Sequence, residues 1–167
     1  PTARQKELLK KAVEKAPKMI LALRKGHRAD KRNLYYKDRQ YNRAWSAATA
    51  EYMQESYLDI NQRASFFQYA YSSAPAMVMR TIGAGSKYPV THRDADGDIL
   101  NGSNQYMLHL PKDNPAAAFW AVTLYNVTDG TMVAEPQLIP SINQYYDVEY
   151  EDDGGLRLYF GPTKPDQ

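Results

Sequence analysis

The chain has 167 residues and a formal net charge of +2, and hydrophobic residues make up 43% of it, enough to bury a core and to exclude wholesale disorder. It contains no cysteine, which excludes disulfide bonds, thiolate nucleophiles and cysteine-ligated metals. It also has no run of about 18 apolar residues, so we expect no membrane-spanning helix.

Charge is distributed unevenly along the chain. Residues 1–45 hold 14 Lys and Arg against 4 Asp and Glu, whereas residues 46–167 hold 7 against 15. Basic residues surround the expected first helix instead of forming one stripe, so we predict no nucleic-acid partner. We interpret the basic arm as packing on the acidic remainder of the chain or on a partner.

The first 86 residues have mainly helical patterns. Thr2 followed by Gln5 predicts a capping box, and a helix over 3–25 follows, with Gly26 as its stop. We expect Pro17 to kink or break this helix near residue 16. Apolar residues recur along it at helical spacing: Leu9, Val13, Ala16, Ile20 and Leu23.

Three further segments lead to the second half of the chain. Residues 27–44 are basic and tyrosine-rich, and we expect an irregular segment with a short helical turn. Residues 45–57 are alanine-rich and predict a helix. Asp59 predicts the start of another helix, whose apolar face continues until Pro75 bends or ends it. Residues 82–86 are interpreted as a flexible link.

From residue 88 onwards the apolar pattern changes to a period of two. Residues 106–110 and 119–125 predict strands, the second of them central and covered on both faces. Asp129-Gly130 predicts a hairpin turn, and 148–151 with 156–160 predict a second hairpin. Helices followed by strands are typical of an α+β fold with an antiparallel sheet. We therefore predict a helical arm and linking region over 1–86 and an antiparallel β-sandwich module over 87–167.

The second half resembles a known family through Asp94-Ala-Asp96-Gly97, Leu100-Asn-Gly102, Tyr106-Met-Leu-His109-Leu-Pro111, Phe119-Trp120-Ala-Val-Thr-Leu-Tyr125 and Tyr159-Phe160-Gly161-Pro162. These motifs are similar to the C-terminal module of bacterial proteins called domain of unknown function 1254 and 1214. Upstream, Tyr36-Lys37-Asp38-Arg39 and Gly83-Ala84-Gly85-Ser86 resemble the linking region of the same family.

The resemblance implies a jelly-roll-like β-sandwich, a bacterial origin and export to the periplasm or the exterior, but no settled activity. Family members usually have a longer N-terminal domain and continue past the Gly-Pro segment. We therefore expect the chain to be part of a longer protein. We also expect it to form a homo-oligomer or to associate with a missing part of the same protein.

The run His92-Arg93-Asp94 combines a base, a cation and an acid, so His92 and Asp94 are the candidate catalytic residues. The alternating acids from Asp94 suggest calcium ligation, but Gly97 follows too early for an EF-hand loop. We interpret this run as a hairpin turn. His92 and His109 have no standard metal-binding spacing, so we predict no metal ligands and no cofactor.

Aromatic residues are abundant, with 14 Tyr and 2 Trp. Aromatic rings near loop ends can stack on ligands, and charged neighbours can bind polar groups. The candidate ligand-binding residues are Tyr88, Arg93, Tyr106, His109 and Tyr125.

Three functions remain open on the sequence alone. The first is a sandwich module that binds a small organic or carbohydrate ligand. The second is a lyase or hydrolase that uses His92, Asp94 and a tyrosine, with or without a metal. The third is a structural or oligomerisation module that acts through the basic helical arm. The first is favoured because aromatic and turn residues are plentiful, whereas no known catalytic motif is complete.

Overall fold

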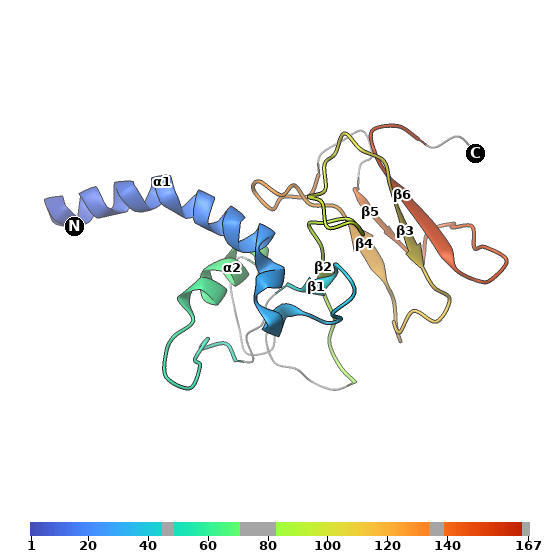
Figure 1. The fold of residues 1–167 in the computed structure, drawn as a ribbon, viewed down its shortest axis with the longest axis horizontal. Helices are drawn as coiled ribbons and strands as arrows, with labels where there is room; N and C mark the ends of the chain where they lie inside the picture. The colour runs from blue at the N-terminus through green and yellow to red at the C-terminus, as the bar shows by residue number, and fades with distance from the viewer. Residues whose placement is uncertain (45–48, 71–82, 134–138, 165–167) are drawn as a thin grey trace. The chain divides into compact units, whose positions relative to one another are not determined.

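A computed structural model describes residues 1–44, 49–70, 83–133 and 139–164 (Figure 1). The chain divides into two compact units, residues 1–99 and residues 100–167. The domain boundary expected after residue 86 stays a prediction. No helix in the described ranges combines the length and the apolar character needed to cross a membrane.

The first unit begins with helix α1 (Ala3–Lys25), as the sequence predicts. The Thr2 hydroxyl accepts a hydrogen bond from the Gln5 N–H at 3.2 Å, and the Thr2 N–H donates to the Gln5 side chain at 2.8 Å. Gly26 ends the helix by donating its N–H to the Ala22 carbonyl at 2.8 Å. The capping box and the stop are therefore confirmed.

Helix α1 continues through Pro17, so a break near residue 16 is wrong, whereas a kink there stays a prediction. Proline lacks one backbone N–H and its ring crowds the preceding turn. The hydrogen bonds of the turns on either side hold this 23-residue helix together despite that local loss.

The segment after α1 is irregular, as expected. It contains two short 3-10 turns, η1 (His27–Ala29) and η2 (Lys31–Asn33), and the short strand β1 (Asn42–Arg43). Strand β2 (Pro89–Val90) pairs with β1 in antiparallel register. This pairing joins two segments that are far apart in the sequence.

The helix predicted over 45–57 is wrong for the part that the structure describes. Residues 45–48 lie outside the described residues, and 49–57 form turns and a bridge between Met53 and Leu58. Tyr52 has a φ of 56°, which a right-handed helix does not allow. Its ring is buried against Phe66 with the centroids 5.9 Å apart. Tertiary packing therefore overrides the helical propensity of the alanines.

Helix α2 (Ile60–Ala70) begins where the sequence predicts. A carboxylate oxygen of Asp59 accepts the Gln62 N–H at 3.1 Å and caps the helix. Tyr52 and Phe66 form the buried centre of this unit, with Ala50 and Ala70 packed against them. The predicted end of the helix at Pro75 lies outside the described residues.

Among its described residues the second unit has four short strands: β3 (Tyr106–Leu110), β4 (Ala121–Thr123), β5 (Ser141–Asn143) and β6 (Leu156–Phe160). Strand β3 pairs with β6, and β4 pairs with β5, both antiparallel (Figure 1). With two helices and antiparallel strands among the described residues, the α+β class is confirmed.

Two strand predictions are wrong. Strand β6 pairs with β3 instead of with residues 148–151. Strand β4 is shorter than predicted and pairs with β5 alone within the described part of the chain, and Phe119 and Tyr125 beside it are 52% and 61% exposed. The turn at Asp129-Gly130 is confirmed, because Asn126 donates its N–H to the Thr131 carbonyl and Tyr125 bridges to Met132.

Candidate functional site

The paired strands β3 and β6 have one inner face and one outer face. Successive side chains along a strand point to opposite faces, so every second position shares an environment. Leu156 and Leu158 on the inner face are only 5% exposed. On the outer face the cross-strand pairs are Met107 with Tyr159 and His109 with Arg157. We call these four residues the β3–β6 outer face.

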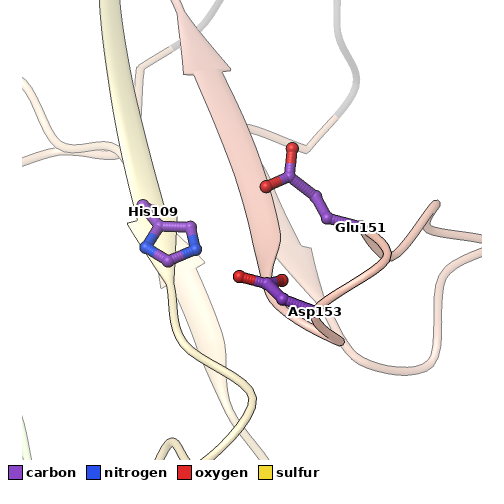
Figure 2. Close-up of side chains that lie close together, drawn as sticks. All are labelled: His109, Glu151 and Asp153. Carbon is purple, nitrogen blue, oxygen red and sulfur yellow. The ribbon is translucent and has the colours of Figure 1, made fainter.

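A tight acidic turn leads into β6. The Glu151 N–H donates to the Gly155 carbonyl at 2.8 Å, and the Gly154 N–H donates to the Glu151 carbonyl at 2.7 Å. Gly154 has a φ of 78°, which suits glycine and lets the chain reverse within the turn. The reversal brings the side chains of Glu151 and Asp153 back beside His109 of β3 (Figure 2).

His109, Glu151 and Asp153 form a cluster of metal-ligating side chains among the described residues of this unit. Their nitrogen and oxygen ligand atoms all lie within 4.8 Å of one another. His109 and Asp153 are exposed, and Glu151 is half-buried. Figure 2 shows the imidazole coming from the strand and the two carboxylates coming from the turn. One imidazole and two carboxylates can hold a metal ion or form several hydrogen bonds to a polar ligand.

Each carboxylate of the cluster has a neighbour that orients it. The Arg157 Nε atom lies 3.0 Å from a carboxylate oxygen of Glu151. The Gly155 N–H donates to a carboxylate oxygen of Asp153 at 2.7 Å. The cluster is therefore held by strand β6 as well as by the turn.

The predicted catalytic residues lie in the other unit. His92 is half-buried and lines a cavity of about 10 Å³ together with Arg24, Arg28, Gln40 and Arg93 among others. A space of this size holds roughly one water molecule. The catalytic roles of His92 and Asp94 stay predictions.

Asp94 serves as the cap of a turn. One of its carboxylate oxygens accepts the N–H of Asp96 at 3.1 Å and that of Asp98 at 2.9 Å. Gly97 has a φ of 91°, and its carbonyl accepts a hydrogen bond from the Arg93 side chain at 2.6 Å. The interpretation of this acidic run as a turn is thus confirmed.

The predicted ligand-binding residues lie in different places. Tyr88 and Arg93 belong to the first unit, and Tyr88 is 57% exposed. In the second unit the Tyr106 hydroxyl accepts the Asn101 N–H at 2.9 Å. Tyr106 alternates with His109 along β3, so the two side chains point to opposite faces. His109 is the predicted residue that the structure brings into the cluster.

Sequence reasoning missed Glu151, Asp153 and Arg157 as site residues. Residues 152–155 form the turn expected between the two strands of the predicted second hairpin, but β6 pairs with β3 and not with residues 148–151. The available signal was the alternation in residues 156–160, where Arg157 and Tyr159 interrupt buried leucines. That pattern predicts an outer face but not which strand lies beside it.

Comparison with protein families finds a match in the part of the chain that contains this cluster. Residues 85–167 match the family described as "Protein of unknown function (DUF1214)". No curated protein matches the chain. The motif at Tyr36 lies before the matched range, so the resemblance of that region stays a prediction. The resemblance to the DUF1214 family is therefore confirmed over residues 85–167, the range that contains His109, Glu151 and Asp153.

Proposed function

We propose that the DUF1214-like segment is a binding module that holds a carbohydrate on the β3–β6 outer face. One observation carries the proposal: the strand register places the Met107–Tyr159 pair directly beside the His109–Arg157 pair. An apolar platform and a set of hydrogen-bonding groups therefore share one exposed surface. A sugar ring presents the matching combination, with apolar C–H faces and hydroxyl groups at its rim.

The chemistry of each pair supports this ligand class. Met107 and Tyr159 are 54% and 53% exposed, so a ligand can reach both side chains without displacing any part of the fold. The aromatic ring offers a flat face for stacking. Arg157 donates hydrogen bonds, and the carboxylates of the acidic turn accept them. An open face of this kind suits an extended oligosaccharide better than a compact apolar molecule, which would need a deep pocket.

Two broader proposals follow from the family resemblance. The first is that β3–β6 and β4–β5 belong to a jelly-roll-like sandwich, which the one-sided burial of Leu156 and Leu158 supports. The second is that the protein is a bacterial protein exported to the periplasm or the exterior. Fractionation of the native cells tests the location, and recovery of the full-length protein from the cytoplasmic fraction would contradict it.

A carbohydrate array followed by calorimetry on the full chain tests the binding function. Replacing Tyr159 with Ala should weaken binding by about two- to tenfold, since stacking on one aromatic ring contributes roughly 0.5–1.5 kcal/mol. Tyr145→Ala is the matched control, because Tyr145 is 78% exposed and lies outside the β3–β6 outer face. Equal binding by the folded Tyr159→Ala variant and the wild type would refute the proposal, as would the absence of binding to any glycan.

A second candidate function is oligomerisation through α1. Every residue from 1 to 19 is exposed, including Leu9 at 58% and Val13 at 72%. These two residues are four apart and lie on the same side of the helix. A second copy of the basic helix arm would repel this one, so the acidic part of another copy is the better partner. The enzymatic alternative through His92 and Asp94 stays a prediction, and the cavity beside His92 has room for about one water.

A further inference from the structure

We propose that His109, Glu151 and Asp153 form a binding site for one divalent first-row transition-metal ion of the Zn²⁺ type. Three protein ligands leave at least one coordination position for water or for a ligand atom. The inference stands on the geometry of the cluster and is independent of the carbohydrate proposal. It departs from the expectation drawn from the sequence, which was that the chain has no metal ligands.

The donor set and its spacing fit such an ion. The ligand atoms lie within 4.8 Å of one another before any ion is present. Ligand atoms of a tetrahedral zinc site lie about 3.4 Å apart, given bonds of about 2.1 Å. The atoms therefore need to close by at most about 1.4 Å, and exposed side chains achieve this by small torsional changes. The strand and the turn do not have to move.

The surroundings of both carboxylates support metal binding. Gly155 binds one oxygen of Asp153 through its N–H, and Arg157 binds one oxygen of Glu151. Each carboxylate has two oxygens and each oxygen has two lone pairs, so a carboxylate can coordinate the ion and still accept its orienting hydrogen bond. The Arg157–Glu151 pair is partly exposed and contributes roughly 0–1 kcal/mol. It is therefore too weak to prevent Glu151 from turning toward a metal.

Gly155 provides a separate observation. A β-carbon at this position would lie 2.7 Å from His109 Nε2 and 2.9 Å from an oxygen of Asp153. Gly154 needs to be glycine because of its φ of 78°, but Gly155 is outside the left-handed region and any residue could adopt its backbone conformation. Glycine is needed at position 155 because a larger side chain would collide with its neighbours. A side chain here would push the imidazole nitrogen and the Asp153 carboxylate apart, so the glycine lets these two groups approach each other.

The ligand types favour a transition metal over calcium or magnesium. Calcium and magnesium are bound almost entirely by oxygen, whereas imidazole is a good ligand for Zn²⁺ and its neighbours in the periodic table. Two carboxylates supply a formal charge of −2, and Arg157 at the edge of the cluster reduces it to about −1. The net local charge therefore still favours a divalent cation.

The test uses the full chain without an affinity tag, first stripped of metal and then titrated with Zn²⁺ in a calorimeter. We expect one ion per chain. Glu151→Gln and Asp153→Asn should each weaken Zn²⁺ binding by about tenfold or more. Asp152→Asn is the matched control, because it removes the same charge from the same turn but is not a ligand, and its affinity should stay within about twofold of the wild type.

A second measurement identifies the nitrogen ligand. Co²⁺ replaces Zn²⁺ at sites of this kind, and its visible absorption responds to nitrogen ligation. His109→Ala should alter that spectrum and weaken binding while circular dichroism shows an unchanged fold. The proposal is overturned if the folded chain binds no Zn²⁺, or if Glu151→Gln and Asp153→Asn bind it as the wild type does. Tighter binding of Ca²⁺ than of Zn²⁺ would also overturn it.

Discussion

Replacing Gly155 with Ala should weaken Zn²⁺ binding while leaving the free energy of unfolding nearly unchanged. The new methyl group would lie 2.7 Å from His109 Nε2, 2.9 Å from an Asp153 oxygen and 3.3 Å from the Leu110 carbonyl. The first two contacts are far too short, whereas the third needs only a small adjustment. His109 and Asp153 are exposed side chains and can rotate away from the new methyl group. The strain is therefore relieved mainly by separating these two side chains from each other.

The expected size of each effect follows from this geometry. Overpacking in a protein interior costs about 1–3 kcal/mol, and the lower end applies here because the clashing side chains can rotate into solvent. Replacing glycine also reduces the entropy of the unfolded chain, which stabilises the folded state by about 0.4–1 kcal/mol. The free energy of unfolding should therefore change by less than about 1 kcal/mol. Zn²⁺ affinity should fall by about tenfold or more, because the imidazole nitrogen is displaced from the carboxylates.

Urea unfolding followed by circular dichroism measures the stability, and calorimetry with Zn²⁺ measures the affinity. Gly102→Ala is the matched control, because a β-carbon at Gly102 would meet no heavy atom within 4 Å. Its Zn²⁺ affinity should stay unchanged, and its free energy of unfolding should rise by at most about 0.4–1 kcal/mol from the lower entropy of the unfolded chain. A folded Gly155→Ala variant that binds Zn²⁺ as tightly as the wild type would refute the claim that a methyl group at this position disrupts the metal site. A loss of stability above about 3 kcal/mol would show that Gly155 serves core packing instead.

Three further results are expected. Leu158→Ala should lower the free energy of unfolding by about 2–4 kcal/mol, because it truncates a side chain on the buried face of β6, whereas Met107→Ala on the outer face should cost less than about 1 kcal/mol. Burial raises the pKa of Tyr41 above its ordinary value of 10.0, so the unfolded chain ionises first and stability should fall as the pH rises above about 10. Tyr41→Phe should flatten that fall in urea titrations at alkaline pH, and an identical fall in the variant would assign it to other groups. Val13→Glu should lower the molar mass in light scattering if α1 mediates self-association, and an unchanged oligomer would remove α1 from the interface.

Features that depend on neighbouring residues were predictable from the sequence. The cap at Thr2, the cap at Asp59 and the turn at Asp94 each involve a side chain and a backbone group at most four residues away. Such contacts form wherever the local chain permits them, so residue type and spacing are sufficient to predict them.

Features that depend on distant residues were not predictable in the same way. The period-two pattern correctly placed β3 and β6, but nothing within either strand specifies its partner, and β6 was assigned to the nearer segment. The helix predicted for the alanine-rich segment around Tyr52 was wrong for a related reason, because the contact of Tyr52 with the distant Phe66 determines the conformation of this segment. His109 could therefore be chosen as a candidate from its residue type, whereas its association with Glu151 and Asp153 required the strand register.

The same register also explains how the two proposed sites can be tested apart although they adjoin. Tyr159 belongs to the β3–β6 outer face but not to the cluster of His109, Glu151 and Asp153. Asp153 belongs to that cluster but not to the β3–β6 outer face. His109 is common to both, and Arg157 connects them because it pairs with His109 across the strands and with Glu151 through its side chain. A change at Tyr159 should therefore affect glycan binding alone, and a change at Asp153 should affect metal affinity first. If metal binding strengthens glycan binding through Arg157, the glycan must strengthen metal binding by the same factor, because coupling between two binding equilibria is reciprocal.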